Sequence, residues 1–160
     1  MNQLELKIPP VALLLIIALM MWIIALMMWG IADLFTSFSF SFFASSFVAL
    51  LIAFLGVVFA LLGVYQFRKQ GTTVDPRIPE KSASLVTSGV YQFSRNPMYV
   101  GMLLMLVGWG IYLGNIAIFI MLPVFILYMN RFQIMPEETF MAEKFGSAYQ
   151  QYKKSVRRWL

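Results

Sequence analysis

Four long apolar stretches divide the chain, and polar or turn-forming segments separate them. The apolar stretches cover residues 11–32, 43–67, 98–113 and 116–134. The first contains no charged residue, and at 1.5 Å per residue it reaches roughly 33 Å, enough to cross the hydrocarbon core of a bilayer. It is too long for the core of a secretory signal peptide and no small-residue cleavage site follows it, so we expect it to be retained. This pattern predicts an all-α integral membrane fold with about four transmembrane helices.

Two of the connections carry their own signals. Phe35 to Phe43 alternates aromatic residues with Ser and Thr, but an open strand is not viable in lipid, so we predict an outer interfacial loop. Gly114-Asn115 is a turn signal between the third and fourth stretches and predicts a tight helical hairpin. The third stretch would be about 24 Å long as a helix, which leaves a tilted or partly re-entrant segment as an alternative.

The second stretch carries a seam of small residues on one helix face. Its members follow one another at spacings of three and four residues: Ala49, Ala53, Gly56, Ala60 and Gly63. Small side chains let two membrane helices approach closely, and such packing drives helix association in lipid. We therefore predict that another helix packs along this seam.

The polar segments are the loop 68–97 and the tail 136–160. In the tail, Glu137 and Glu138 lie in the expected first helical turn and basic residues lie near the end, which suits the helix dipole. Gly146 is expected to divide this helix into two pieces. An apolar stripe at helical spacing predicts an amphipathic interfacial helix. The stripe consists of Met141, Phe145, Ala148, Tyr152, Val156 and Trp159.

The distribution of basic residues predicts the orientation in the membrane. The loop 68–97 and the tail 136–160 hold five basic residues each, whereas the first and third connections hold none. Since cytoplasmic segments of membrane proteins are rich in Lys and Arg, we expect the N and C termini to be cytoplasmic.

Composition supports one membrane domain over residues 1–160 and limits its chemistry. The chain is 61% apolar and 12% charged, with a mean hydropathy of +0.79, a balance that excludes a water-soluble domain. Without His or Cys it has no histidine base, zinc site, disulfide or cysteine nucleophile, and we expect no metal. The net charge of +5 points to anionic membrane lipid rather than nucleic acid, because the basic residues flank apolar spans.

Two polar segments are expected to meet on the cytoplasmic side, because the predicted helical hairpin connects them. Their meeting would form a pocket there. The first is the segment from Leu85 to Gly101 and the second runs from Asn130 to Glu138. The ordered motifs within and after them resemble the membrane methyltransferases related to isoprenylcysteine carboxyl methyltransferase, and the related phospholipid N-methyltransferases share the general pattern. These motifs are Ser94-Arg95-Asn96-Pro97-Met98-Tyr99-Val100-Gly101, Pro136-Glu137-Glu138, the stretch from Phe145 to Tyr152, and Val156-Arg157-Arg158. The resemblance covers residues 72–160.

This resemblance implies methyl transfer from S-adenosylmethionine, bound by the Arg-x-Pro-x-Tyr-x-Gly and Glu-Glu segments. Glu137 and Glu138 can accept hydrogen bonds from the cofactor's hydroxyl and amino groups. Arg95, or backbone N–H groups between Val86 and Tyr91, can hold its carboxylate. The remaining cofactor-binding candidates are Gly89, Asn96, Pro97, Tyr99 and Gly101.

Tyr99, Gly89 and Gly101 also have a purely structural interpretation. Tyr99 either stacks on or hydrogen-bonds the cofactor, or is an ordinary interfacial aromatic residue. Gly89 either lets the backbone approach the cofactor or forms a turn, and Gly101 either does the same or serves helix packing. Asn96 stands where the carboxyl methyltransferases have His, and Asn does not titrate near neutral pH, which does not favour isoprenylcysteine as the substrate.

Arg131 and Glu137 are the catalytic candidates. Arg131 either anchors an anionic group of the substrate, or snorkels to the interface or pairs with a Glu. The resulting hypothesis is methyl transfer at the cytoplasmic membrane face to a lipophilic or small substrate bearing a carboxylate, amine or thiol. A non-catalytic scaffold or lipid-binding bundle is the alternative. A transporter is disfavoured because the span centres carry no charge.

Overall fold

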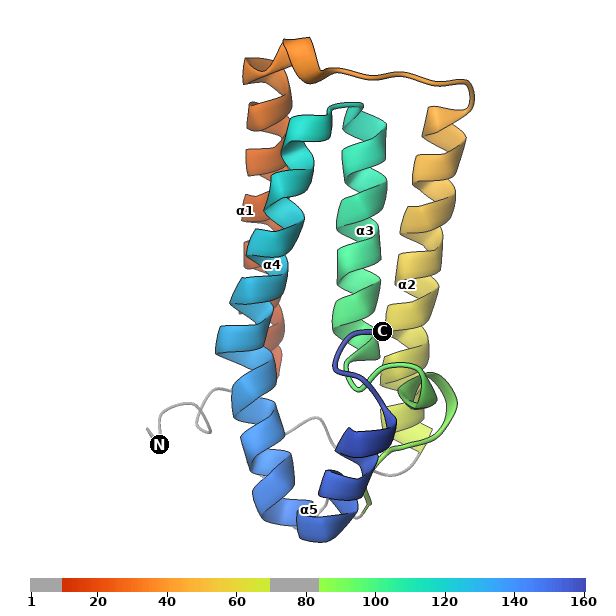
Figure 1. Cartoon of the computed structure of the whole chain (residues 1–160), viewed down its shortest axis with the longest axis vertical. Coiled ribbons are helices and arrows are strands. Elements are labelled where there is room, and N and C mark those ends of the chain that lie inside the picture. Colours follow the sequence, from red (N-terminus) through yellow and green to blue (C-terminus); the bar gives the residue numbers. More distant parts are fainter. Residues whose placement is uncertain (1–9, 70–83) are drawn as a thin grey trace.

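The computed structural model describes residues 10–69 and 84–160, which form an elongated helical bundle (Figure 1). Three helices run the length of the bundle, α1 (Pro10–Leu34), α2 (Ser45–Lys69) and α3 (Pro97–Leu113). The last long helix begins with a 3₁₀ segment, η5 (Ile116–Ile120), and continues through α4 (Met121–Met129), the π-turn η6 (Asn130–Ile134) and α5 (Met135–Ser155). The predicted all-α membrane fold is confirmed.

Three of these helices are long and apolar enough to cross a membrane, namely Leu15–Leu34, Ser45–Lys69 and the continuous helix Ile116–Ser155. The fourth, α3, is apolar but has only 17 residues. It is one unbroken helix that runs along α2 in Figure 1. At 1.5 Å per residue, about 20 residues of the Ile116–Ser155 helix are enough to cross the hydrocarbon core. A crossing that begins at Ile116 therefore ends near Met135, before Pro136.

Helices α2 and α3 are in close backbone contact along the small-residue seam. An added Cβ on Gly56 would lie 2.6 Å from the carbonyl oxygen of Gly101, and one on Gly108 would lie 2.7 Å from that of Ala49. Both distances are too short for real side-chain contacts. The predicted seam is confirmed, and its partner is a matching glycine stripe on α3.

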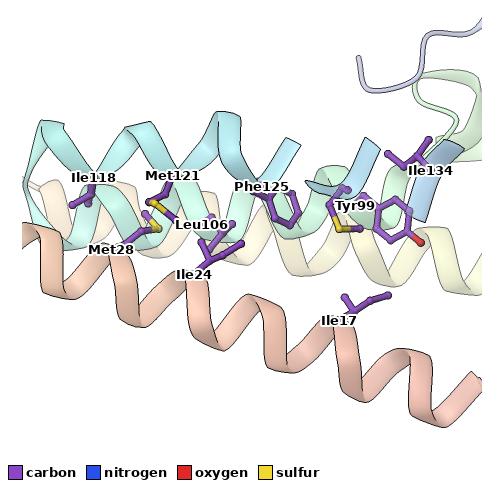
Figure 2. Packing of buried hydrophobic residues seen from close by; sticks show 10 residues of the cluster. Ile17, Ile24, Met28, Tyr99, Leu106, Ile118, Met121, Phe125 and Ile134 are labelled. Atoms are coloured by element: carbon purple, nitrogen blue, oxygen red, sulfur yellow. The ribbon is translucent and has the colours of Figure 1, made fainter. Parts of the chain in front are cut away.

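The buried apolar core lies between α1, α3 and the last long helix. Ile24 and Met28 of α1 meet Leu106 of α3 and Phe125 of α4, as Figure 2 shows. The outward faces of α1 and α2 carry large exposed apolar side chains such as Trp22, as expected for surfaces that face lipid.

The predicted loop after α1 and the predicted turn after α3 meet at the end of the bundle opposite α5 (Figure 1). The loop after α1 contains a short 3₁₀ turn, η2 (Thr36–Phe38). Buried Asn115 donates from Nδ2 to the carbonyl oxygen of Phe35 over 2.7 Å. The Phe40 N–H donates to the carbonyl of Gly114. The backbone of Gly114 is left-handed, with a φ of 61°. The turn at Gly114-Asn115 is therefore confirmed.

The tail differs from the prediction in two ways. It does not begin a separate helix at Pro136, because α5 continues directly from α4 through the π-turn. A proline cannot donate to the carbonyl four residues earlier, here that of Phe132, and the π-turn lies across that carbonyl. The helix also ends at Ser155 and not at Leu160, since Val156 is extended. The predicted division at Gly146 is confirmed by its φ of 50° and ψ of −122°.

Candidate functional site

Residues 84–96 form an entry segment that leads into α3 and packs against the end of α2. Val86 and Tyr91 are buried against Phe59 and Phe67 of α2. The short 3₁₀ turn η4 (Gly89–Gln92) begins at Gly89, whose φ is 64° and whose added Cβ would collide with the side chain of Gln66. Gly89 thus allows both a tight turn and a close approach to α2.

Val156–Trp159, just before the last residue of the chain, form a non-helical strap that returns to the start of α3 (Figure 1). The N–H of Arg95 donates to the carbonyl of Arg157 over 3.0 Å. The Arg95 guanidinium donates to the carbonyl of Val156 over 2.6 Å, and Asn96 Nδ2 donates to the carbonyl of Arg158 over 2.9 Å. The strap and the entry segment therefore hold one another through backbone carbonyls.

Glu138 is the centre of a cluster of positive charges. Arg95 Nη2 lies 2.6 Å from its Oε1, and Arg158 grips both of its oxygens, with Nε 3.0 Å from Oε1 and Nη2 2.7 Å from Oε2. Lys153 Nζ lies farther away, 3.7 Å from Oε2. The Arg95 and Glu138 side chains are only 8% and 10% exposed.

The surroundings of Glu138 keep it ionised. Burial by itself raises the pKa of this carboxyl, but hydrogen bonds and charges from Arg158 and Arg95 outweigh burial and lower the pKa to about 2. A carboxylate that accepts several charge-assisted hydrogen bonds is strongly favoured over its neutral form. Glu138 is therefore a fixed negative charge at neutral pH.

Glu137 is placed differently from its neighbour. Its Oε1 accepts a hydrogen bond of 2.6 Å from the hydroxyl of Tyr99, which is buried in the first turn of α3. Burial raises the pKa of Glu137 to about 7, against a lowering by the Tyr99 hydrogen bond, and the charge of Glu138 raises it further. The residue as a whole is nevertheless exposed in the isolated chain. This exposure is that of the residue as a whole, whereas burial of the carboxyl itself brings its pKa near neutral pH.

A groove of about 380 Å³ lies between the entry segment and the second half of α5. Leu85 and Thr87 line one side, and Ala148, Gln151 and Tyr152 line the other. The hydroxyl of Tyr152 donates to the carbonyl of Tyr91 over 2.6 Å and so ties the two walls together. Its volume is within the range of small-molecule sites.

The structure brings together most of the residues that the sequence predicted. Arg95, Asn96, Tyr99, Glu137 and Glu138 are linked by the contacts described above. Pro97 is buried in the first turn of α3 and starts that helix. Val86, Gly89 and Tyr91 belong to the entry segment beside them.

Two predicted residues lie elsewhere. Gly101 faces α2, where an added Cβ would lie 2.7 Å from Cβ of Ala60, so its contacts are those of helix packing. Arg131 is exposed in the π-turn, and its proposed role in anchoring an anion stays a prediction.

Sequence reasoning treated Arg158 only as part of a motif and of a basic helix end, and Trp159 only as part of an apolar stripe. In the structure the Arg158 guanidinium grips Glu138, and Trp159 Nε1 donates to Asn130 Oδ1 over 3.1 Å. The Val156-Arg157-Arg158 motif was a usable signal, but it does not say which of its two arginines reaches a carboxylate.

Comparison with known proteins shows the family of the chain. The family model described as phospholipid methyltransferase matches residues 44–148, which is more than half of the chain. The chain belongs to the phospholipid methyltransferase family. The match includes α2, α3, α4, the entry segment and Glu137-Glu138, but it ends before the strap.

Two relatives cover smaller parts of the chain. An uncharacterized protein of Haemophilus influenzae is 48% identical over 63 residues, which are 39% of this chain and 100% of that protein. The Protein-S-isoprenylcysteine O-methyltransferase of Schizosaccharomyces pombe is 37% identical over 79 residues, which are 48% of this chain but only 32% of that enzyme. No solved structure matches.

Proposed function

We propose that this protein is an S-adenosylmethionine-dependent methyltransferase that acts at the cytoplasmic membrane face on a lipophilic or small substrate. The observation that carries the proposal is the Glu137 carboxyl, held by Tyr99 next to the Arg95–Glu138 ion pair. Membership of a methyltransferase family supports it. The name of the fission yeast relative supports the same reaction type.

The residues at this end of the bundle suit such a cofactor. The cofactor presents hydroxyl and amino donors together with one carboxylate, and the exposed Glu137 is an acceptor for the donors. The Arg95 side chain is only 8% exposed and holds Glu138, and its buried Nε has no hydrogen-bond partner among the described residues, so the site contains one unsatisfied donor. The groove beside Tyr152 offers about 380 Å³ next to the same segment.

The bound cofactor would supply an electrophilic methyl group carried on a positively charged sulfur. A substrate nucleophile would take up that methyl group and leave the sulfur as a neutral thioether, with Glu137 and Arg95 as the residues that would hold the cofactor. Positioning and exclusion of water carry most of the catalysis in such a transfer. The protein needs no nucleophile of its own, which fits a chain without His or Cys.

Glu137 has a second task if the acceptor is an amine. A protonated amine has no lone pair, so it must lose its proton before it can attack. A carboxyl with a pKa of about 7 is well matched to accept that proton at neutral pH. A carboxylate substrate needs no such base, so loss of activity in a Glu137→Gln variant with cofactor binding retained would favour an amine substrate.

The test uses the purified full chain in lipid nanodiscs with methyl-labelled S-adenosylmethionine and a total lipid and thiol extract. We expect label in one extracted product, which is then identified. Cofactor binding is measured separately by calorimetry, because binding without transfer would support a non-catalytic bundle. In Glu137→Gln, loss of a charge-assisted acceptor should weaken cofactor binding by about ten- to a hundredfold. Glu143→Gln, an exposed acid on the same helix, is the matched control. Absence of cofactor binding in the unmodified chain would refute the proposal.

A further inference from the structure

The strap Val156–Trp159 contacts Arg95, Asn96 and Glu138 of the proposed site, although it follows the residues that match the family model. We propose that Arg158 and Trp159 are positioning residues, which fix the direction of Glu137 and Glu138 relative to Arg95 and Tyr99 without touching the substrate. This inference rests on the proposed function. It adds a requirement for a segment that lies outside the matched region.

Arg158 joins the strap to two elements at once. Its guanidinium forms a two-pronged contact with Glu138, while its carbonyl oxygen accepts hydrogen bonds from Asn96 Nδ2 at 2.9 Å and Ser94 Oγ at 3.3 Å. A planar fork on a carboxylate fixes orientation as well as distance, which a lysine ammonium does not. Arg158 therefore holds the start of α5 at a set angle to the start of α3.

Trp159 joins the strap to the π-turn. Its Nε1 donates to Asn130 Oδ1 over 3.1 Å, and its ring meets the ring of Phe125 edge to face with centroids 6.3 Å apart. Asn130 is the first residue of the π-turn. The indole thus contacts both the turn and the last spanning helix before it.

The π-turn decides where Glu137 and Glu138 point. Compared with an α-helix it contains one extra residue, and each helical residue advances by about 100°, so all later side chains are rotated by about that angle relative to α4. Glu137 reaches Tyr99 and Glu138 reaches Arg95 in this rotated position. A strap that fixes Asn130 at one end of the turn and Glu138 after it keeps the rotation in place.

The test compares Arg158→Gln, Arg158→Lys and Trp159→Phe with the unmodified full chain in nanodiscs. Arg157→Gln is the matched control, because Arg157 is exposed and meets Arg95 through its backbone carbonyl, which the substitution keeps. Infrared titration of the Glu138 carboxyl is one readout, assigned by its loss in Glu138→Gln. Turnover and cofactor KM with the product found in the labelling experiment are the others.

We expect Arg158→Gln to lower kcat by about ten- to a hundredfold and to move the Glu138 titration to higher pH. Arg158→Lys should restore most of the titration shift, because the charge returns, but less than half of the lost kcat, because the fork does not. Trp159→Phe keeps an aromatic ring beside Phe125 but removes the N–H together with part of the indole, so kcat should fall about five- to tenfold and Tm should fall slightly. Arg157→Gln should change none of these quantities.

Two results would overturn the inference. The first is an Arg158→Gln variant whose Glu138 titration is that of the unmodified chain. The second is a set of variants in which only Tm falls while kcat per folded molecule stays constant, which is the behaviour of a purely structural segment. If Arg158→Gln does not fold, Arg158→Lys and Trp159→Phe decide the same question. Failure of the proposed function looks different, because the unmodified chain then neither binds cofactor nor transfers label, whereas the infrared titration needs no cofactor and still supports or overturns the strap contact.

Discussion

Replacing each of the two neighbouring glutamates by glutamine should affect a different property of the protein. Glu138→Gln removes the negative charge that Arg95, Arg158 and Lys153 share. Glu137→Gln removes a charge from an exposed position but keeps an oxygen that can accept from the hydroxyl of Tyr99. We therefore expect the first substitution to cost stability and the second to cost cofactor binding.

The magnitudes follow from how deeply each partner is buried. The Arg95 side chain is only 8% exposed, and Glu138 is its one carboxylate partner among the described residues. Leaving one member of a buried ion pair without its partner costs about 3 to 5 kcal/mol. The Arg158 and Lys153 side chains are 34% and 43% exposed, so water replaces much of what they lose and they add little. We expect a loss of about 3 kcal/mol for Glu138→Gln and less than about 1 kcal/mol for Glu137→Gln.

The assay is reversible unfolding by SDS in mixed micelles, followed by calorimetric titration of S-adenosylmethionine into the folded variants. The control is Glu143→Gln, which removes an acid from an exposed position of the same helix. The double variant Glu138→Gln with Arg158→Gln should be less destabilised than the sum of the single variants, because the two residues share one contact. Equal stability of the Glu137 and Glu138 variants would refute this assignment of roles.

Three further predictions concern the packing of α2 and α3, the pH dependence of stability and the orientation in the membrane. Gly101→Ala should lower the free energy of unfolding in the SDS titration by about 1 to 3 kcal/mol, because the new methyl collides with α2. The control is Gly30→Ala, which should be close to neutral because nothing lies within 4 Å of the added Cβ. Because the folded pKa of Glu138 lies at about 2, below its ordinary value of 4.5, its contribution to stability is complete above about pH 4.5 and is lost as the pH falls toward 2. This loss is measured in the Glu137→Gln background, since the raised pKa of Glu137 acts in the opposite sense. A reporter fused after Leu160 should read cytoplasmic, and a periplasmic or extracellular signal would reverse the predicted orientation.

The sequence by itself determined the spans, the seam and the motif residues of the site. Apolar length predicted four helices because a bilayer requires about 20 apolar residues per crossing. Small residues at helical spacing predicted the face of α2 that packs closely, which Gly56 and Gly101 confirm. Left-handed backbone at Gly114 and the break at Gly146 were also predictable, because glycine adopts these conformations without a steric penalty.

Only the tertiary structure distinguished Glu137 from Glu138. Adjacent glutamates look the same in a sequence, and their difference arises because the arginines that surround Glu138 come from residues 43 and 20 positions away along the chain. The π-turn was equally hidden, because one added residue within Asn130–Ile134 leaves no distinct pattern in the sequence. The strap after Ser155 was predicted as helix, since its apolar and basic residues fit a helical stripe. Its backbone is not helical, and its carbonyls instead accept hydrogen bonds from Arg95 and Asn96. Such long-range hydrogen bonds outweigh local helix propensity.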